Sequence, residues 1–181
     1  MSNFNPRFKL HKACRNDEYY PRLQYVHFRN GFAYASNAYV IVRARITEIA
    51  NLPFDFVKML DGYSIRWEDF ERILKCDHIV VRENGLIYIQ ISDNSHLQIG
   101  MERIDNLPNF DGLLDKQGTI SVNEDICLNP LRLTQMFDAM GADEEDKIVF
   151  RFCGAGKPCI ACYPPDSDLS IMGCILAKRI D

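Results

Sequence analysis

Residues 23–46, LQYVHFRNGFAYASNAYVIVRARI, decide the fold because they predict three consecutive antiparallel strands. The apolar-rich runs are LQYVHF, FAYAS and YVIVRARI. Asn30-Gly31 separates the first two runs, and this pair is a strong hairpin signal since both residues tolerate positive φ. Just before this stretch, residues 8–16 have apolar side chains at helical spacing. The start of the chain therefore predicts a short amphipathic helix followed by three strands.

The same order of elements occurs twice more along the chain. Residues 67–76 predict a second helix and residues 130–140 a third, which begins with Asn129 as an N-cap and Pro130 in its first turn. The strands predicted around these two helices are 78–83, 86–92, 96–104, 119–122, 147–154, 158–164 and 169–180. This repetition indicates three β-α-β-β-β-like units, the first without its opening strand. The predicted fold is α+β, with helices packed on an antiparallel sheet.

The units define the expected domains. We expect residues 1–116 to form one domain of two units, 1–48 and 62–116, joined by a connection with a helical turn at 54–60. Residues 117–181 are expected to form a third unit that packs on the first.

The composition limits the functional classes. The 181 residues are 47% hydrophobic and carry a formal net charge of −4, which argues against a tail-like electrostatic binder of nucleic acid but leaves a local basic face open. No apolar run approaches the roughly 20 residues of a membrane span, and the N-terminus resembles no signal peptide. The seven cysteines are irregularly spaced, which favours reduced thiols over a disulfide framework. We therefore expect a cytoplasmic protein with no membrane partner.

The stretch RFCGAGKPCIACYPP, residues 151–165, superficially resembles a phosphate-binding loop. Such a loop requires a glycine where this chain has Arg151, a Ser or Thr where it has Pro158, and a helix afterwards. The residues that follow are strand-like, so we interpret the stretch as a turn between two strands.

The cysteines of this stretch are the candidates for a metal site. Cys159 and Cys162 have the spacing of a zinc knuckle, with Cys153 as a third candidate ligand. On a strand, however, residues three apart point to opposite faces, so these thiols should not converge. We expect structural thiols and no metal, and keep a cysteine-dependent metal or redox protein as a third hypothesis.

No pattern in the chain indicates catalysis. The acidic run at 143–146 is interpreted as an exposed turn, and Trp67 as a core residue on the apolar stripe of its helix. Signatures of hydrolases and metalloproteases are not found. We expect neither catalytic residues nor a cofactor.

Basic side chains recur on or beside the predicted helices, which is the arrangement that phosphate contacts need. The candidate DNA-binding residues are Lys9, Lys12, Arg15, Arg66, Arg72, Lys75 and Arg132. Glu68, Asp69, Glu71 and Asp138 share the same helices, so a solvated face of mixed charge is the alternative.

Several stretches resemble bacterial sliding clamps, the β subunit of the replicative polymerase. These are EYYPRLQYVHFRNGFAYASNAYVIVRARI near the start, ICLNPLRLTQMFDAMG with KIVFRFCG, PCIACYP and SIMGCILAKRI at the end, and SIRWEDFERILK, HIVVRENGLIYIQI and IDNLPNFDGLLDK between them. The family's Asp-Gly after the hairpin is Asn37-Ala38 here, and its closing Met-Pro-Met-Arg-Leu-like tail is replaced by LAKRI. The chain has about half the length and half the units of a full clamp subunit.

The resemblance implies a non-enzymatic DNA clamp, a processivity-type scaffold in replication or repair that binds duplex DNA without sequence preference. It also implies an apolar pocket for short peptides of polymerases or other clamp-binding partners. Carried over by position, that pocket would involve Ile41, Pro108, Leu113, Ile175, Leu176, Arg179 and Ile180. A homo-oligomer is expected, and both a four-subunit ring and no ring stay open. The alternative is a clamp-fold protein-interaction module that does not encircle DNA.

Overall fold

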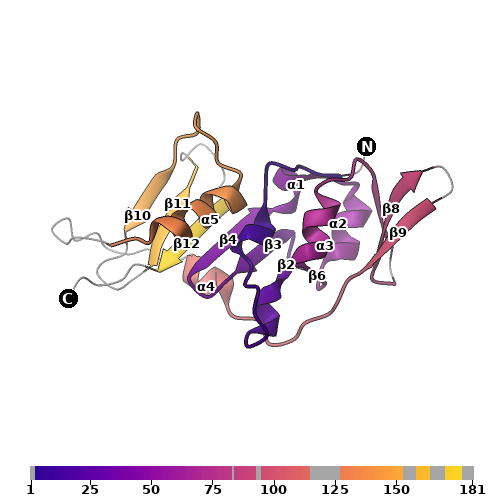
Figure 1. The fold of residues 1–181 in the computed structure, drawn as a ribbon, viewed down its shortest axis with the longest axis horizontal. Helices are drawn as coiled ribbons and strands as arrows, with labels where there is room; N and C mark the ends of the chain where they lie inside the picture. The colour runs from indigo at the N-terminus through magenta and orange to yellow at the C-terminus, as the bar shows by residue number, and fades with distance from the viewer. Residues whose placement is uncertain are drawn as a thin grey trace.

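The computed structural model describes residues 3–82, 84–92, 95–114, 127–152, 158–163 and 170–176. In these residues a seven-stranded sheet carries helices on its faces, and a separate three-stranded sheet lies beside it (Figure 1). Helices and antiparallel strands confirm the predicted α+β class. With η for 3-10 helices, the elements are β1 (Asn3–Phe4), η1 (Leu10–Ala13), η2 (Pro21–Gln24), β2 (Tyr25–Arg29), β3 (Phe32–Ser36), β4 (Val40–Arg45), α1 (Ile46–Ile49), β5 (Ala50–Asn51), α2 (Phe54–Leu60), β6 (Ser64–Arg66), α3 (Trp67–Ile73), β7 (Ile79–Arg82), β8 (Leu86–Ser92), β9 (Ser95–Gly100), α4 (Phe110–Leu114), α5 (Pro130–Met140), β10 (Val149–Phe152), β11 (Pro158–Cys162) and β12 (Ile171–Leu176).

The predicted first hairpin is present. β2 pairs with β3, and Asn30 and Gly31 between them have φ of 52° and 78°, as the turn requires. Asp61, which lies outside the hairpin in the sequence, stabilises this turn because its carboxylate accepts a hydrogen bond of 2.6 Å from the Asn30 backbone amide.

The large sheet joins the two ends of the chain. Its order is β10-β11-β12-β4-β3-β2-β6, and all its neighbouring strands are antiparallel. β12 pairs directly with β4, from Ile171 opposite Ala44 to Ile175 opposite Val40. The last strands of the chain therefore extend the sheet that its first strands begin.

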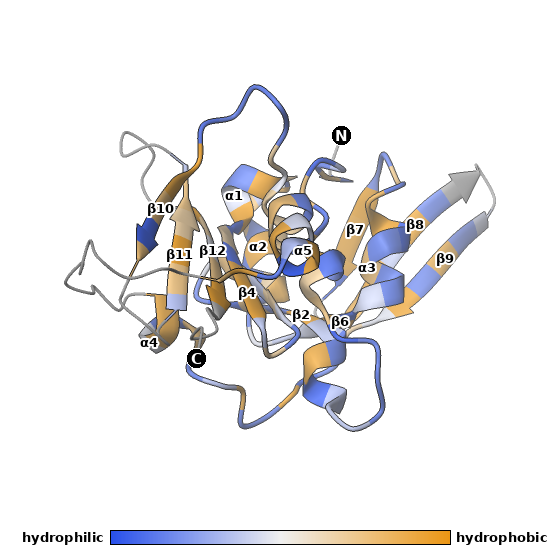
Figure 2. Ribbon diagram, turned by 60° about the vertical axis from the view of Figure 1, so that its left-hand side comes forward, coloured by the Kyte–Doolittle hydropathy of each residue, from blue (hydrophilic) through white to orange (hydrophobic). Residues whose placement is uncertain are grey.

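Side chains alternate between the two faces of this sheet, and both faces are buried. Val40, Val42 and Ala44 of β4 belong to the larger core cluster, whereas Ile41 belongs to the smaller one. The larger cluster packs under η1, α3 and α5, and the smaller one under α4. Figure 2 shows the resulting apolar character of β4, β11 and β12.

Helix α5 has the residues predicted for it. The Asn129 side chain accepts a hydrogen bond of 2.9 Å from the Leu131 amide, and Gly141 ends the helix in the left-handed region with φ 73°. The helix lies close to the sheet because β12 has glycine beneath it. A Cβ at Gly173 would lie 2.6 Å from Met136 Cγ and from Met140 Sδ.

Some predicted elements differ from the observed ones. The first helix is a single 3-10 turn at Leu10–Ala13 instead of 8–16, and the second ends at Ile73 instead of residue 76. Strand β6 was not predicted, because three residues with one apolar side chain carry little periodic signal. The strand expected at 119–122 lies outside the described residues.

Candidate nucleic-acid and partner-binding surfaces

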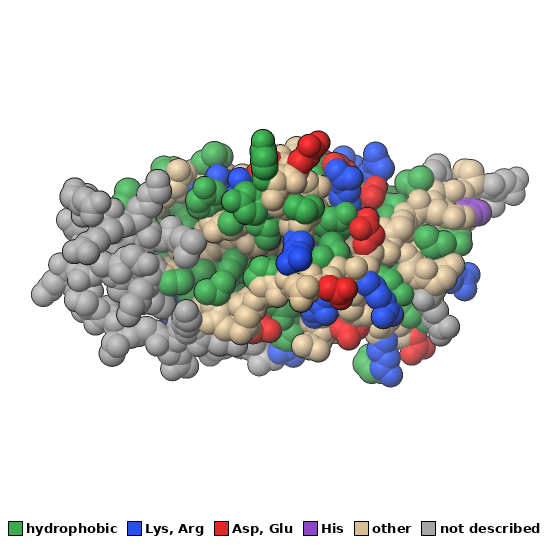
Figure 3. Space-filling model, turned by 90° about the horizontal axis from the view of Figure 1, so that it is seen from below, with side chains coloured by type: hydrophobic (Ala, Val, Ile, Leu, Met, Phe, Trp, Pro, Cys, Tyr) green, Lys and Arg blue, Asp and Glu red, His purple; other side chains and the backbone are tan. Residues whose placement is uncertain are grey.

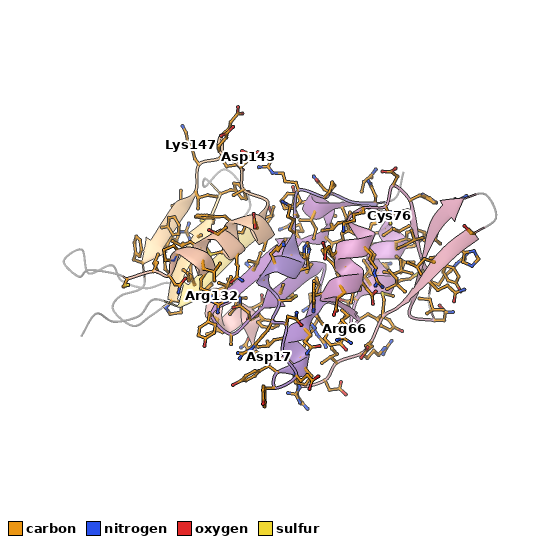
Figure 4. All side chains as sticks on the ribbon, in the orientation of Figure 1. Asp17, Arg66, Cys76, Arg132, Asp143 and Lys147 are labelled. Atoms are coloured by element: carbon orange, nitrogen blue, oxygen red, sulfur yellow. The ribbon has the colours of Figure 1, made fainter. Side chains whose placement is uncertain are left out.

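Most of the candidate DNA-binding residues lie on or beside the helices that cover one face of the large sheet, whereas Arg66 is the last residue of β6 and pairs with Tyr25 of β2. Lys9, Lys12 and Arg15 lie on or beside η1; Arg66, Arg72 and Lys75 on or beside α3; and Arg132 on α5. Buried residues of all three helices pack into the same core cluster, and η1 contacts both α3 and α5. Figure 4 labels Arg132 on α5, Arg66 farther along the molecule and Asp17 below both in this view.

Acidic neighbours pair with most of these cations. Arg66 lies 2.9 Å from Glu68, Arg72 lies 2.9 Å from Asp69, and Lys75 lies 3.3 Å from Glu71. Arg15 pairs with Asp17, and Arg132 donates a hydrogen bond of 2.7 Å to Gln135. Among the described residues, Lys9 and Lys12 are the two candidates that make no such contact.

The charge on the surface is correspondingly mixed. Figure 3 shows basic and acidic side chains interspersed over the face that it presents. Exposed ion pairs of this kind are easily exchanged for phosphate contacts, because each contributes only about 0–1 kcal/mol. The acidic partners reduce the positive electrostatic potential near the helices, but the basic side chains can still contact phosphate groups.

Exposed tyrosines stand beside two of the arginines, a feature that the sequence analysis missed. The Arg15 guanidinium lies 4.0 Å from the ring centroid of Tyr20, and that of Arg132 lies 4.7 Å from the ring centroid of Tyr39. Tyr19 is 90% exposed. The consecutive tyrosines of EYYP could have suggested an aromatic surface, but the sequence alone did not show that these side chains are exposed to solvent.

An apolar pocket of about 220 Å³ opens on the other side of the sheet. It lies between β4, β12, the β3–β4 turn and the segment that leads into α4. Its lining residues are Leu23, Ser36, Ala38, Tyr39, Ile41, Pro108, Phe110, Leu113, Pro158 and Cys174. Few polar groups face it, so it suits an apolar side chain better than a charged ligand.

Polar contacts hold α4 over this pocket. The Tyr34 hydroxyl donates to the Asp111 carboxylate at 3.0 Å, and Arg43 forms an ion pair with the same carboxylate at 2.8 Å. The Phe110 ring stacks on Tyr34 with centroids 5.6 Å apart. The pocket wall is thus fixed to the sheet from two directions.

The structure brings together some of the residues predicted for a peptide pocket. Ile41, Pro108 and Leu113 line it. Ile175 does not, because it is buried in the core cluster on the helix side, and its neighbour Cys174 faces the pocket instead. Leu176 ends β12, and Arg179 and Ile180 lie outside the described residues.

Cys159 and Cys162 lie on opposite faces of the sheet, as predicted. Cys159 belongs to the helix-side cluster and Cys162 to the α4-side cluster, so the pair cannot bind one metal ion. Within the described ranges, no group of three or more potential ligands is arranged around a common point. Cys153 and the predicted glycine-rich turn lie outside those ranges.

The acidic run after α5 is tied to the start of the chain. Arg7 lies 3.2 Å from Asp143, forms a second ion pair with Asp146 and donates to the Gly141 carbonyl. Burial opposes ionisation of Asp146, but the hydrogen bond from the Asp143 amide and the Arg7 guanidinium together lower the pKa of this carboxyl. These contacts give the run a structural role in joining the two ends of the chain. In the part of the chain that is described, no helix is long and apolar enough to cross a membrane.

This architecture belongs to the class of DNA-clamp folds. The chain is similar to a DNA polymerase III beta chain from Streptococcus pneumoniae TIGR4, with a TM-score of 0.61 and 13% identity over 96% of this chain and 63% of that one. It is also similar to a putative DNA polymerase III beta subunit from Eubacterium rectale ATCC 33656, with a TM-score of 0.57 and 7% identity over 97% of this chain and 62% of that one. The predicted clamp resemblance is confirmed for the fold.

The chain spans about three fifths of the length of both solved structures. At these identities the likeness establishes the fold alone. Comparison with family models and with curated proteins by sequence gives no match.

Proposed function

We propose that the protein is a non-enzymatic, sliding-clamp-like scaffold of DNA replication or repair. In this proposal the helix side binds duplex DNA without sequence preference, and the apolar pocket binds peptides of a polymerase or another clamp-binding partner. The observation that carries it is a clamp-fold sheet in which the helices that bear most of the candidate cations cover one face and an apolar pocket opens on the other.

DNA binding is tested by fluorescence anisotropy with a labelled duplex over a range of salt concentrations. Reversal of charge in Lys12→Glu, Arg72→Glu and Arg132→Glu together should weaken binding and make its salt dependence shallower by about 2–3 in the log–log slope. The matched control reverses Lys58, Arg103 and Lys147, three exposed cations outside η1, α3 and α5. Undetectable binding by the unmodified protein at low salt would overturn the DNA-binding role.

Partner binding is tested by calorimetry with peptides from the replicative polymerase of the same cell. Ile41→Arg places a charge in the pocket and should abolish binding. The control is Thr47→Arg, which adds the same charge at an exposed position. If the two variants bound the peptides with equal affinity, the apolar pocket would not be the peptide-binding site.

Assembly is proposed from the free edges of the sheets. β10 is an edge strand of the large sheet and β9 of the small one, and within the described residues neither edge has a partner. Such edges can pair between copies of a chain and close a ring of identical contacts. Light scattering at micromolar concentration should find a discrete homo-oligomer, and a monomer alone would contradict this part.

A second candidate function is a clamp-fold protein-interaction module without DNA encirclement. It is favoured by the ion pairs of Arg15, Arg66, Arg72 and Lys75 and by the net charge of −4. The two candidates differ in the anisotropy experiment, because the module alone should show no affinity for the duplex.

A further inference from the structure

A second pocket, of about 350 Å³, lies between η1 and α3. Its charged lining consists of Lys9 just before η1, Lys12 in η1, Glu71 in α3 and Lys75 just after α3. His11 also borders it. Two elements far apart in the sequence thus bring four ionic side chains and one imidazole around a single hollow.

The pocket has an excess of positive charge. Three lysines face one glutamate, which leaves a formal charge of +2. Glu71 is committed to Lys75 at 3.3 Å, while Lys9 and Lys12 have no ion pair among the described residues. By contrast, Arg15, Arg66 and Arg72 each pair with a nearby acid.

His11 adds an unsatisfied polar group. Its side chain is 7% exposed, and its Nδ1 is buried without a hydrogen-bond partner. Burial lowers its pKa, a direction that Lys12, Lys9 and Lys75 reinforce and Glu71 opposes, so the ring is neutral at pH 7. Because a buried N–H without an acceptor is costly, the ring proton is favoured on Nε2. The neutral ring therefore adds no third unpaired charge to the pocket.

We propose that this pocket binds a phosphate monoester, such as the terminal phosphate of a DNA strand or of a free nucleotide. A monoester carries about −1.5 to −2 at pH 7, which matches the formal charge of the pocket better than the single charge of a backbone diester. Two unpaired lysines supply the charge-assisted donors that such a group prefers. The inference rests on the proposed function where the monoester is a DNA end, because the pocket lies on the side assigned to DNA.

The experiment follows the histidine side-chain NMR signals of the full chain during titration. The probes are inorganic phosphate, adenosine monophosphate, and one duplex prepared with 5′-phosphate or with 5′-hydroxyl ends. Phosphate should shift the His11 signals and raise the pKa of His11, because a nearby dianion favours the charged ring. His27 is the internal control, since it is buried and both its ring nitrogens have hydrogen-bond partners.

Substitution then tests the lysines. Lys9→Gln with Lys12→Gln should weaken phosphate binding about tenfold or more, since one charge-assisted contact corresponds to roughly that factor. Lys147→Gln removes an exposed charge from the loop after α5, away from this pocket, and should leave the affinity unchanged (Figure 4). A far-ultraviolet spectrum of each variant checks that it is folded.

The outcomes separate this inference from the proposed function. Tighter binding of the 5′-phosphorylated duplex supports a DNA end as the ligand, and an equal response to adenosine monophosphate supports a free nucleotide. A His11 response to phosphate without any duplex binding supports the pocket and removes the DNA role. Duplex binding with no His11 response to phosphate, to adenosine monophosphate or to the 5′-phosphorylated duplex overturns the monoester pocket and leaves the DNA role intact.

Discussion

Lowering the pH from 7 to 5 is expected to destabilise the protein through His27. This histidine is 1% exposed, its Nε2 lies 2.9 Å from the Arg22 carbonyl oxygen, and its Nδ1 lies 2.8 Å from Ser64 Oγ. A carbonyl oxygen only accepts, so Nε2 carries the proton and Nδ1 accepts from the serine hydroxyl. A second proton on Nδ1 would reverse the direction of that hydrogen bond and place a positive charge inside the core.

The size of the effect follows from the pKa. Burial lowers the pKa of His27 to about 4, and the charge of Arg29 acts in the same direction against the opposing Arg22 carbonyl. The unfolded chain has an ordinary histidine with a pKa of about 6.5. Between these values the unfolded state binds more protons, so stability falls as the pH falls. The expected loss from pH 7 to pH 5 is about 2 kcal/mol.

The assay is urea unfolding followed by the fluorescence of Trp67, the single tryptophan of the chain, at pH 7, 6 and 5. The His27→Gln variant should be less stable at pH 7 but should lose less stability on acidification. The His11→Gln variant measures the contribution of the other buried histidine. A measured His27 pKa near 6.5, or equal pH dependence of His27→Gln and the unmodified protein, would refute the reasoning.

Other predictions concern packing and caps. Gly173→Ala should destabilise the fold by about 1–3 kcal/mol in urea unfolding, because the new Cβ meets Met136, and the added substitution Met136→Ala should recover part of that loss. Asn129→Ala should cost about 1 kcal/mol by removing the N-cap of α5, whereas Asn129→Asp should retain most of the stability. Tyr34→Phe should cost about 1 kcal/mol and speed amide exchange in α4, because the hydroxyl no longer donates to Asp111; unchanged exchange would show that this bond does not hold the helix.

Local signals predicted much of the fold. The hairpin at Asn30-Gly31 was identified because these residues have turn preferences that do not depend on the rest of the chain. Helix α5 was predicted with its observed limits, since Asn129 and Pro130 set its start and its apolar residues follow one stripe. The 3-10 turn η1 was overestimated because its periodic residues continue into a backbone that is not helical.

The candidate sites were less predictable. Ile41 was placed in the apolar pocket by resemblance, and the alternation of β4 puts it there, but Ile175 was assigned to the wrong side of its strand relative to that pocket. A shift of one residue along a strand moves a side chain to the other face of the sheet, and a resemblance in sequence pattern does not fix the alignment to within one residue. Likewise, no sequence pattern indicated that Lys75, just after α3, would line a pocket with Lys9, His11 and Lys12.

By itself, the sequence determined the repeated order of helix and strands, the hairpin turn and the limits of α5, because these depend on interactions between residues close in the chain. Only the tertiary structure decided that β12 pairs with β4, that Cys174 and not Ile175 faces the apolar pocket, and that Lys75 lines one pocket with Lys9, His11 and Lys12. Those contacts join segments separated by more than sixty residues. These contacts form because helices and loops from distant parts of the chain bury both faces of one sheet. The conformational preferences of neighbouring residues do not determine which distant segments pack together.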